Sequence, residues 1–456
     1  MTPPARQSSA EDRAPPPETA AWVLAGRAFV RGRLQSVEIG ISEEGSIVSV
    51  GKVGSNAPRH DVGESVILPS ATDLHVHFRE PGGSADVETI ATGSVQAALG
   101  GVALVGEMPN TEPPVTDVDA LEDKAARVQG HAAVDFLLYA SPTHSRALDR
   151  LSTRAGAFKL YLSPTTGIDS PPGPADLGPL LQRLAELGLP VSVHAEDPAQ
   201  FSPASAAQNP AGWDSARPPA AERAAVERLL QLAPPALRLH VAHVTEAETV
   251  DRLRAAGVSF EVTPHHVFLS ERSRADALTK VNPPLRSEPA RRALWERYLR
   301  GEVPCVASDH APHSRTAKER PFPLAPSGMP GVETMLPLLL ASVRAGTLAL
   351  PVVAATACDR PARWLGQPHG RIAPGHRAHL LVVDFRNRGR IDPRRLHAPC
   401  GWTAFEGWEA IFPREHYLHG QKIVEDGEYV GRPTGVTVRP EFAHRPRGSG
   451  SVRRSA

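Results

Sequence analysis

The stretch ATDLHVHFREPGG (residues 71–83) places two histidines, His75 and His77, one residue apart among apolar neighbours. An arginine and a Pro-Gly-Gly turn follow at once. Successive side chains of a strand point to opposite faces, so residues at positions i and i+2 share one face. The spacing therefore predicts a buried strand that ends with two imidazole groups on the same side.

That strand is the first of eight short apolar segments, and each is followed by Ala-, Leu- and Arg-rich sequence typical of helices. The other seven segments are VALVGEM, DFLLYA, FKLYL, VSVHA, LHVAHV, FEVTPH and CVASD. Strand–helix alternation over roughly 300 residues is the pattern of a (β/α)8 barrel. We therefore predict an α/β fold whose main body is a TIM-like barrel over residues 68–375.

The flanks of the predicted barrel have a different rhythm. Residues 21–67 show period-two segments separated by Gly-rich turns, which predicts short antiparallel strands, and residues 376–433 show the same. We expect the two segments to join into one small β-sandwich domain, with the barrel inserted between them. Residues 1–20 are rich in Pro and Ala, and residues 434–456 are polar, so we expect a disordered arm and a disordered tail.

Composition excludes several classes of function. The chain has 50 Lys and Arg residues and 50 Asp and Glu residues, so its formal net charge is zero. That balance gives no electrostatic reason to expect nucleic acid or an acidic membrane as partner. The sequence has no apolar run long enough to span a membrane and no secretory signal. Its three cysteines are far apart and show no CxxC spacing, which favours a reducing cytoplasm.

Metal-ligating side chains stand where barrel strands are predicted to end. After the histidine pair come Lys159, His194, His243 and Asp309, each on a different strand. Active sites of such barrels lie at the carboxyl ends of the strands, and imidazole and carboxylate groups are ligands for zinc and similar metals. A single histidine in an apolar strand is more often an ordinary core residue, but the set in barrel order predicts a metal centre.

Three neighbouring features stay open on the residues alone. His240 lies three positions before His243 and so on the opposite face of its strand, and we prefer His243 as the ligand. Lys159 would be costly to bury as a bare ammonium, so a lysine that reaches solvent or pairs with a carboxylate is the simpler reading. Nothing assigns a role to Glu261 or to the pair His265 and His266.

Nine motifs in order carry a resemblance to a known family. They are DLHVHFREPG, GEMPNTEPPVTD, FKLYLSPTTG, VSVHAEDP, HVAHVTEAE, EVTPHHVFL, KVNPPLR, ASDHAPHS and SGMPGVETMLPLLL. Together they resemble the cyclic amidohydrolases, and among these most closely the dihydroorotases. The resemblance implies two Zn²⁺ ions per subunit, with His75, His77 and Asp309 on one and His194 and His243 on the other. It implies that Lys159 carries CO2 as a carbamate and bridges both ions together with a hydroxide, which would explain a buried lysine.

The same resemblance implies a reaction: reversible hydrolysis of the cyclic amide of dihydroorotate to N-carbamoyl-aspartate, a step of pyrimidine synthesis. Hydroxide would attack the ring carbonyl, and Asp309 would take its proton and pass it to the departing ring nitrogen. Contacts to the substrate are expected from Arg79, Asn110 and His313 on its carboxylate, from Asn282, Ser327 and Gly328 on the amide edge of the ring, and from Thr165 on a lid loop.

Alternatives remain for the pocket and for the protein. Arg79 could pair with Glu80 or Asp73, and Asn110 could cap a turn. An allantoinase or a dihydropyrimidinase would share the metal ligands, although the combination of Arg79 and Asn110 favours a dihydroorotase. A non-catalytic scaffold partner of aspartate carbamoyltransferase is the third reading, and the presence of all six ligand positions argues against it. The family also suggests a homodimer and a possible aspartate carbamoyltransferase partner.

Overall fold

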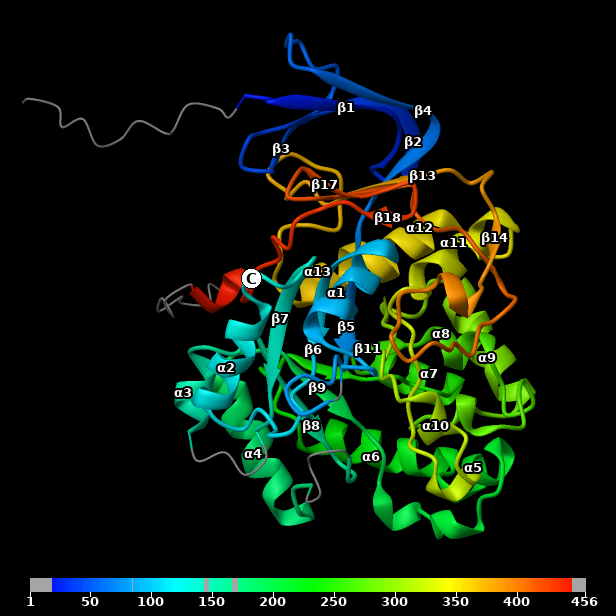
Figure 1. Ribbon diagram of the computed structural model, residues 1–456. Coiled ribbons are helices and arrows are strands. Elements are labelled where there is room, and N and C mark those ends of the chain that lie inside the picture. Colours follow the sequence, from blue (N-terminus) through cyan, green and yellow to red (C-terminus); the bar gives the residue numbers. More distant parts are fainter. Residues whose placement is uncertain (1–18, 84, 143–146, 166–170, 445–456) are drawn as a thin grey trace, which may run out of the picture.

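The computed structural model of the chain describes residues 19–83, 85–142, 147–165 and 171–444, and most of the predicted arm and the end of the predicted tail lie outside them (Figure 1). Its centre is an eight-stranded parallel sheet in the order β12-β11-β10-β9-β8-β7-β6-β5. The strands are β5 (Ala71–Val76), β6 (Val102–Glu107), β7 (Asp135–Ala140), β8 (Ala157–Tyr161), β9 (Val191–His194), β10 (Leu239–Val241), β11 (Ser259–Val262) and β12 (Cys305–Val306). These are the eight segments predicted from the sequence.

The first and the last strand close this sheet into a barrel. A parallel bridge joins Val76 to His310, and the backbone N–H of His77 donates to the carbonyl of His310 at 2.7 Å. Deeper in the barrel, the Asp73 carboxylate accepts the Ser308 N–H at 2.9 Å. The barrel strands are buried on both faces, which a parallel sheet covered by helices requires.

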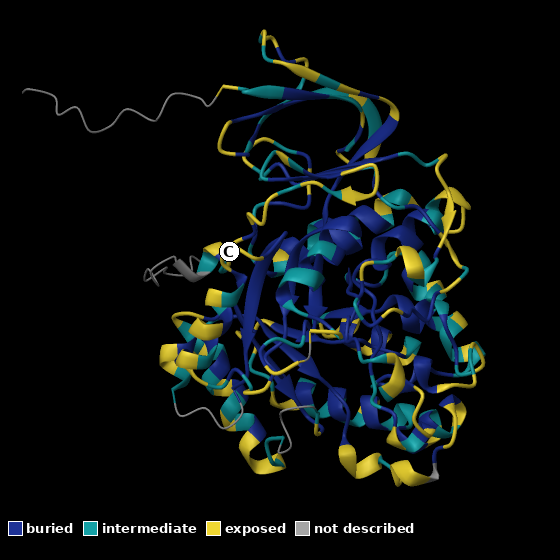
Figure 2. Ribbon diagram, in the orientation of Figure 1, coloured by how far each residue is buried: buried dark blue, intermediate teal, exposed yellow. Residues whose placement is uncertain are grey.

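Helices surround the barrel, and their exposed residues lie on the outside (Figure 2). They are α1 (Ile90–Leu99), α2 (Val118–Val128), α3 (Leu148–Ser152), α4 (Pro174–Leu187), α5 (Pro210–Ala216), α6 (Pro219–Leu232), α7 (Ala247–Ala255), α8 (Pro264–Phe268), α9 (Glu288–Leu299), α10 (Arg315–Lys318), α11 (Met335–Arg344), α12 (Leu350–Val353) and α13 (Arg360–Trp364). Local signals define their ends: Thr89 and Thr92 form a capping box before α1, and α4 begins with Pro174 and ends at Gly188 in the left-handed region. None of the helices in the described ranges is long and apolar enough to cross a lipid bilayer.

The flanking segments form one further sheet, in the order β18-β17-β16-β13-β4-β1-β2-β3. Its strands are β1 (Trp22–Val30), β2 (Arg33–Ile41), β3 (Ile47–Gly51), β4 (Arg59–Pro69), β13 (Leu380–Val383), β16 (Glu415–Leu418), β17 (Gln421–Glu425) and β18 (Glu428–Tyr429). A core of its own joins the two halves, with Leu24 and Ile39 packed in one cluster with Leu380 and Tyr417. β4 runs almost directly into β5, so the small domain is attached to the first barrel strand (Figure 1).

Within this β domain, two expectations need correction. The strands are not all antiparallel, because β1 and β4 pair in parallel. The segment between β13 and β16, which holds β14 (Gly389–Arg390) and β15 (Glu409–Ala410), belongs to the barrel side instead. Its Trp402 and Phe405 pack in one apolar cluster with Leu285 and Met329 of the barrel, so burial of apolar area draws this excursion away from the sheet.

The predicted disordered tail is wrong for residues 434–444. The N–H of Phe136 donates to the carbonyl of Val436 at 2.9 Å, and the N–H of Val438 donates back to Phe136 at 2.8 Å. This stretch thus adds backbone hydrogen bonds to the start of β7. A Cβ on Gly435 would lie 1.9 Å from the carbonyl oxygen of Val134, so only glycine permits this close approach. A polar, proline-containing sequence gave no signal of such docking.

Candidate metal centre at the barrel mouth

All six predicted ligand residues lie together at the carboxyl ends of the barrel strands. We name this set the mouth cluster: His75 and His77 at the end of β5, Lys159 on β8, His194 ending β9, His243 after β10, and Asp309 after β12. The Oδ1 of Asp309 is 3.4 Å from Nε2 of His75 and 3.3 Å from Nε2 of His77. Nζ of Lys159 is 3.3 Å from the same His75 nitrogen.

The other two histidines form the second half of the cluster. Nδ1 of His194 lies 2.9 Å from Nε2 of His243, and the His243 ring is 5.3 Å from that of His75. The two halves are therefore adjacent, and Lys159 lies in the barrel wall with its side chain fully buried.

Hydrogen bonds on the far side of three rings determine which nitrogen faces the centre. Nδ1 of His75 donates to Glu261 at 2.6 Å, and Nδ1 of His77 donates to Oδ1 of Asn110 at 2.7 Å. Both rings then present an unprotonated Nε2. His194 is turned around, because its Nε2 donates to Glu196 at 2.8 Å and Nδ1 faces inward. Such outer partners orient metal-binding imidazoles.

Burial keeps these imidazoles neutral. Desolvation is the largest cause that lowers the pKa of His75 to about 4, and it holds the pKa values of His77 and His243 well below their usual range. Desolvation also lowers the pKa of Lys159 to about 8. Among the described residues, no carboxylate forms an ion pair with this lysine, so the pairing that we considered from sequence is not what the structure has.

Three residues of the site adopt a left-handed backbone conformation that non-glycine residues rarely use. The φ angles are +62° for Arg79, +38° for His243 and +47° for Asp309. Each such residue costs of order 1–3 kcal/mol, and it persists only where the surrounding structure enforces it. Their concentration at one end of the barrel indicates that the backbone there is shaped for function.

A pocket opens over the mouth cluster. Its wall contains five of the six cluster residues, all but Lys159, together with Arg79, Asn110, Tyr161, Pro164, Thr165, Asn282, Ala311, Ser327 and Gly328. Six of the seven predicted substrate contacts are therefore brought to one place. The lid loop that we expected after Thr165 includes residues 166–170, which lie outside the described residues.

The seventh predicted contact, His313, lies against Arg79. Its Nε2 is 3.1 Å from Nη2 of Arg79 and 2.9 Å from the carbonyl oxygen of Ser327. Nε of Arg79 donates to the carbonyl of Pro312 at 3.1 Å. Arg79 is thus held from the β12 side of the barrel and does not pair with Glu80, which binds Arg127 instead.

Backbone geometry explains why residue 328, in the wall of the pocket over the mouth cluster, is a glycine. Gly328 has a φ of +133°, and a Cβ there would lie 2.4 Å from the carbonyl oxygen of Ala311. Asn282 is oriented by Trp213, whose indole N–H donates to its Oδ1 at 3.1 Å. Both residues reach the pocket from loops, and the N–H of Gly328 joins the two loops by donating to the carbonyl of Lys280 at 2.9 Å.

Sequence reasoning missed three residues of the site. Glu261 accepts hydrogen bonds from both His75 and His240, although we assigned it no role. Glu196 holds His194 and is itself paired with a buried arginine, Arg217. Tyr161 lines the pocket with a buried hydroxyl for which the described part of the chain provides no hydrogen-bond partner. Glu196 and Tyr161 each lie two residues from a predicted ligand, and this spacing was the available signal.

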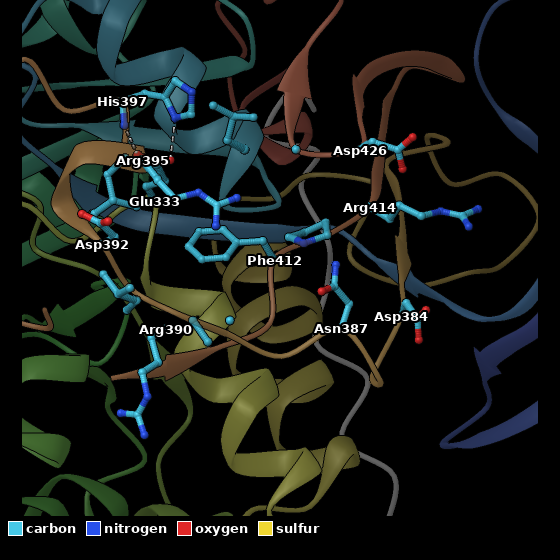
Figure 3. Close-up of a pocket in the computed structure, with 17 residues that line it drawn as sticks. Glu333, Asp384, Asn387, Arg390, Asp392, Arg395, His397, Phe412, Arg414 and Asp426 are labelled. Atoms are coloured by element: carbon cyan, nitrogen blue, oxygen red, sulfur yellow. Dashed lines mark hydrogen bonds and ion pairs between the residues drawn. The ribbon is translucent and has the colours of Figure 1, made fainter. Parts of the chain in front are cut away.

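A separate cavity of about 300 Å³ lies between the excursion after β13 and the barrel (Figure 3). Arginines and carboxylates alternate around it, and His397 is bound there to Glu333 at 2.8 Å. None of the predicted site residues lines this cavity. The metal ligands and substrate contacts predicted from the sequence therefore lie at the barrel mouth and not in this cavity.

Comparison with known proteins agrees with this geometry. A family model described as Dihydro-orotase-like matches residues 64–161, which contain His75, His77 and Lys159. A curated dihydroorotase from Halobacterium salinarum is 40% identical over 382 residues, which cover 82% of this chain and 89% of that protein. The chain belongs to the dihydroorotase family. A dihydroorotase from Thermoplasma volcanium is 34% identical over 416 residues, 91% of this chain and 96% of its own length.

Solved structures place the family's fold among the cyclic amidohydrolases. An L-hydantoinase (dihydropyrimidinase) from Arthrobacter aurescens aligns with a TM-score of 0.87 and 25% identity, covering 92% of this chain and all of that one. A D-hydantoinase aligns with a TM-score of 0.84 at 23% identity, which bears on the fold alone. The predicted barrel class and the resemblance to dihydroorotases are both confirmed.

Proposed function

We propose that this chain catalyses the reversible hydrolysis of dihydroorotate to N-carbamoyl-aspartate. It is a hydrolase of cyclic amides, as its membership of the dihydroorotase family indicates. The observation that carries the choice of substrate is the position of Arg79 and Asn110 together in the wall of the pocket over the mouth cluster. A guanidinium beside the reacting centre suits a cyclic amide that bears a carboxylate.

The donor set of the mouth cluster fits a pair of zinc ions. We propose that His75, His77 and Asp309 hold one ion, that His194 and His243 hold the other, and that Lys159 bridges them. Three of the imidazoles present an inward nitrogen whose opposite nitrogen is already bonded, and all are neutral, as ligands must be. No described residue forms a hydrogen bond with the buried Nδ1 of His243, so packing and the contact of its Nε2 with His194 hold the ring.

We propose that Lys159 is carboxylated. A pKa lowered to about 8 leaves an appreciable fraction of the amine uncharged near neutral pH, and only the uncharged amine reacts with CO2. The uncharged amine first arises from the ammonium by loss of one proton. Its reaction with CO2 then forms an N–C bond and releases a second proton, so that a buried cation becomes an anion with two oxygens. A buried ammonium would need a carboxylate partner, and the described residues provide none. The carbamate anion removes that need.

The mechanism follows from what each side chain can do. When bound, zinc ions supply Lewis acidity, which lowers the pKa of a water molecule and polarises a carbonyl oxygen. Asp309, close to both His75 and His77, accepts the proton of the attacking water and delivers it to the ring nitrogen as the amide bond breaks. Its strained backbone holds the carboxylate in that position.

Substrate orientation is assigned to the pocket wall. Arg79 binds the substrate carboxylate, with His313 and the carbonyl of Pro312 holding its guanidinium in place. The Oδ1 of Asn110 accepts the hydrogen bond from His77, so the amide nitrogen of Asn110 is available as the second donor to the substrate carboxylate. Asn282 and the backbone at Ser327 and Gly328 contact the amide edge of the ring, and Thr165, also in the pocket wall, contributes a hydroxyl.

The test is a paired assay with purified, zinc-loaded protein. Ring opening of dihydroorotate, allantoin and dihydrouracil is measured for the wild type, Arg79→Met and the control Arg315→Met, an exposed arginine that pairs with Glu319. We expect turnover of dihydroorotate alone, and a loss of roughly 100-fold or more in kcat/KM for Arg79→Met only. Removing one partner of a buried charged pair costs about 2–5 kcal/mol.

Each other outcome has a distinct meaning. Turnover of allantoin or dihydrouracil with unchanged metal content would replace the assigned substrate and keep the metal centre. No turnover of any substrate by metal-loaded protein would support the scaffold reading.

We further propose a cytoplasmic location, which the three buried, free cysteines support. A homodimer and an aspartate carbamoyltransferase complex stay predictions from the family, and sedimentation of the chain with and without that enzyme would check both.

A further inference from the structure

A second group of metal-ligating side chains lies at the opposite end of the barrel, where the β domain meets it. We name it the junction cluster: Asp135, His379 and His419. Asp135 is the first residue of β7, and so lies at the amino ends of the barrel strands. His379 directly precedes β13, and His419 directly follows β16. Three elements from two parts of the fold thus converge.

Distances in the junction cluster resemble those of the mouth cluster. One ligand atom from each residue lies within 4.8 Å of the other two. Nε2 of His419 is 3.0 Å from Oδ2 of Asp135, and Nε2 of His379 is 3.9 Å from that same oxygen. Ligands of a tetrahedral zinc ion stand about 3.4 Å apart, given metal–ligand bonds of about 2.1 Å. The gap of 3.9 Å is too long for a hydrogen bond.

Two of the imidazoles around this gap, His369 and His379, are buried and have, within the described ranges, only long hydrogen-bond contacts of 3.4 Å. The ring of His379 lies 4.6 Å from that of His419 and 5.1 Å from that of His369, both edge to face. Nδ1 of His369 is buried and has no hydrogen-bond partner among the described residues, and the residue is only 3% exposed. His379 is itself buried, and its Nε2 lies at the gap beside Asp135.

We propose that Asp135, His379 and His419 form a second site for Zn²⁺ or a similar divalent transition metal, which ties the β domain to the barrel. Two imidazoles and one carboxylate are donors that zinc accepts. His419 is partly exposed, so water from that side completes the coordination. The site is structural, because it lies at the end of the barrel opposite the pocket. It does not depend on the proposed catalytic function.

Binding would replace the pair between Nε2 of His419 and Asp135, which lies 3.0 Å from Oδ2 and 3.1 Å from Oδ1, together with two weaker contacts. Nη1 of Arg377 is 3.8 Å from Oδ2 of Asp135, and its side chain is exposed enough to turn into solvent. The backbone N–H of His419 reaches Nδ1 of His379 only at 3.4 Å. When Nε2 of His379 coordinates a metal, the ring proton moves to Nδ1. Nδ1 then no longer accepts the hydrogen bond from His419. The N–H of Val436 continues to donate to Oδ1 of Asp135, now an outer partner of a ligand.

The first test is the zinc content of the full chain after equilibrium dialysis against buffered Zn²⁺. We compare the wild type with His379→Gln and His419→Gln, and with His376→Gln as a matched control on the same segment. We expect both cluster variants to hold one zinc ion fewer per chain than the wild type and the control. All four proteins should hydrolyse dihydroorotate at similar rates. Equal zinc content in the wild type and in folded variants would overturn the proposal.

A second measurement covers variants that fail to fold. Crystals of the wild-type protein grown with Zn²⁺ are measured above and below the zinc absorption edge. An anomalous peak between Asp135, His379 and His419 supports the site, whatever is found at the mouth cluster. Its absence from zinc-equilibrated crystals overturns the site. A peak at the junction cluster without one at the mouth cluster would keep this inference and remove the catalytic metal, so the two proposals fail separately.

Discussion

The mouth cluster and the junction cluster contain the same ligand types, but only one of them faces a pocket with groups for a substrate. Asp309 at the mouth lies beside a cavity wall that carries Arg79 and Asn110. Asp135 at the junction is enclosed by a β-domain histidine and by the backbone of Val436. The difference teaches that ligand chemistry alone does not make a catalytic centre. Access for a substrate marks the mouth, whereas left-handed backbone occurs in both clusters, at His419 as well as at His243 and Asp309.

The largest expected effect concerns the carboxylate of the mouth cluster. Asp309→Asn should lower kcat for dihydroorotate by roughly 10²–10⁴-fold, because positioned proton transfer contributes that much. Steady-state hydrolysis of dihydroorotate measures it, with His379→Gln as the control that keeps its activity. A variant that retains a tenth of the wild-type rate would remove Asp309 from the role of proton carrier.

The next effect concerns the bridge between the two halves of the mouth cluster. Lys159→Ala should lose both bound zinc and activity by more than roughly 100-fold, since even an outer partner of a ligand is worth 10–100-fold. A short carboxylic acid added to the variant should restore part of both, because it replaces the carbamate oxygens. Zinc analysis and the same assay measure this. Lys422→Ala, at a partly exposed lysine of β17 that pairs with Glu425, serves as the control. Unchanged zinc content in Lys159→Ala would contradict the bridge.

A smaller effect should come from the carboxylate behind His75. Glu261→Gln keeps the shape of the side chain but weakens the acceptor of the His75 and His240 hydrogen bonds. We expect about a 10–100-fold loss of zinc affinity at the mouth, the usual result for such partners. Competition with a zinc chelator measures the affinity. If the affinity stays unchanged, packing alone orients His75.

The smallest effect separates the two clusters by stability. With zinc present, His379→Gln should unfold at a temperature lower than that of the wild type by about 2 °C or more, because a metal bound only by the folded state stabilises it. That difference should shrink when a chelator removes the metal. Thermal unfolding with and without chelator checks this, and His376→Gln should follow the wild type. A difference that is equal in both conditions would indicate lost packing rather than a lost ion.

Local periodicity explains why so much of the fold was predictable. Each barrel strand is a short apolar run followed by a helix, so the eight segments could be recognised one at a time. The preference for His243 over His240 rested on alternation within a single strand, and His243 does lie in the pocket wall whereas His240 binds Glu261 and Ser259. The chemical roles of the mouth residues remain proposals, although their convergence was expected from strand order alone.

Other features had no local signal. The segment between β13 and β16 has the same period-two sequence pattern as the strands around it. Its Trp402 nevertheless packs on the barrel and donates to the carbonyl of His313 at 2.7 Å. Residues 434–444 read as a polar tail because their hydrogen bonds are made by the backbone, which is the same for every sequence. Both errors come from contacts with distant partners.

By itself, the sequence determined the barrel, the order of its strands and which side chains stand at their ends, because the period of two and the alternation with helices are properties of neighbouring residues. Only the tertiary structure decided which partner orients each ligand and which histidines meet outside the mouth. His75 and Glu261 are 186 residues apart, and His419 and Asp135 are 284 apart. Such pairs exist only once the chain has closed into a barrel and the β domain has packed against its end.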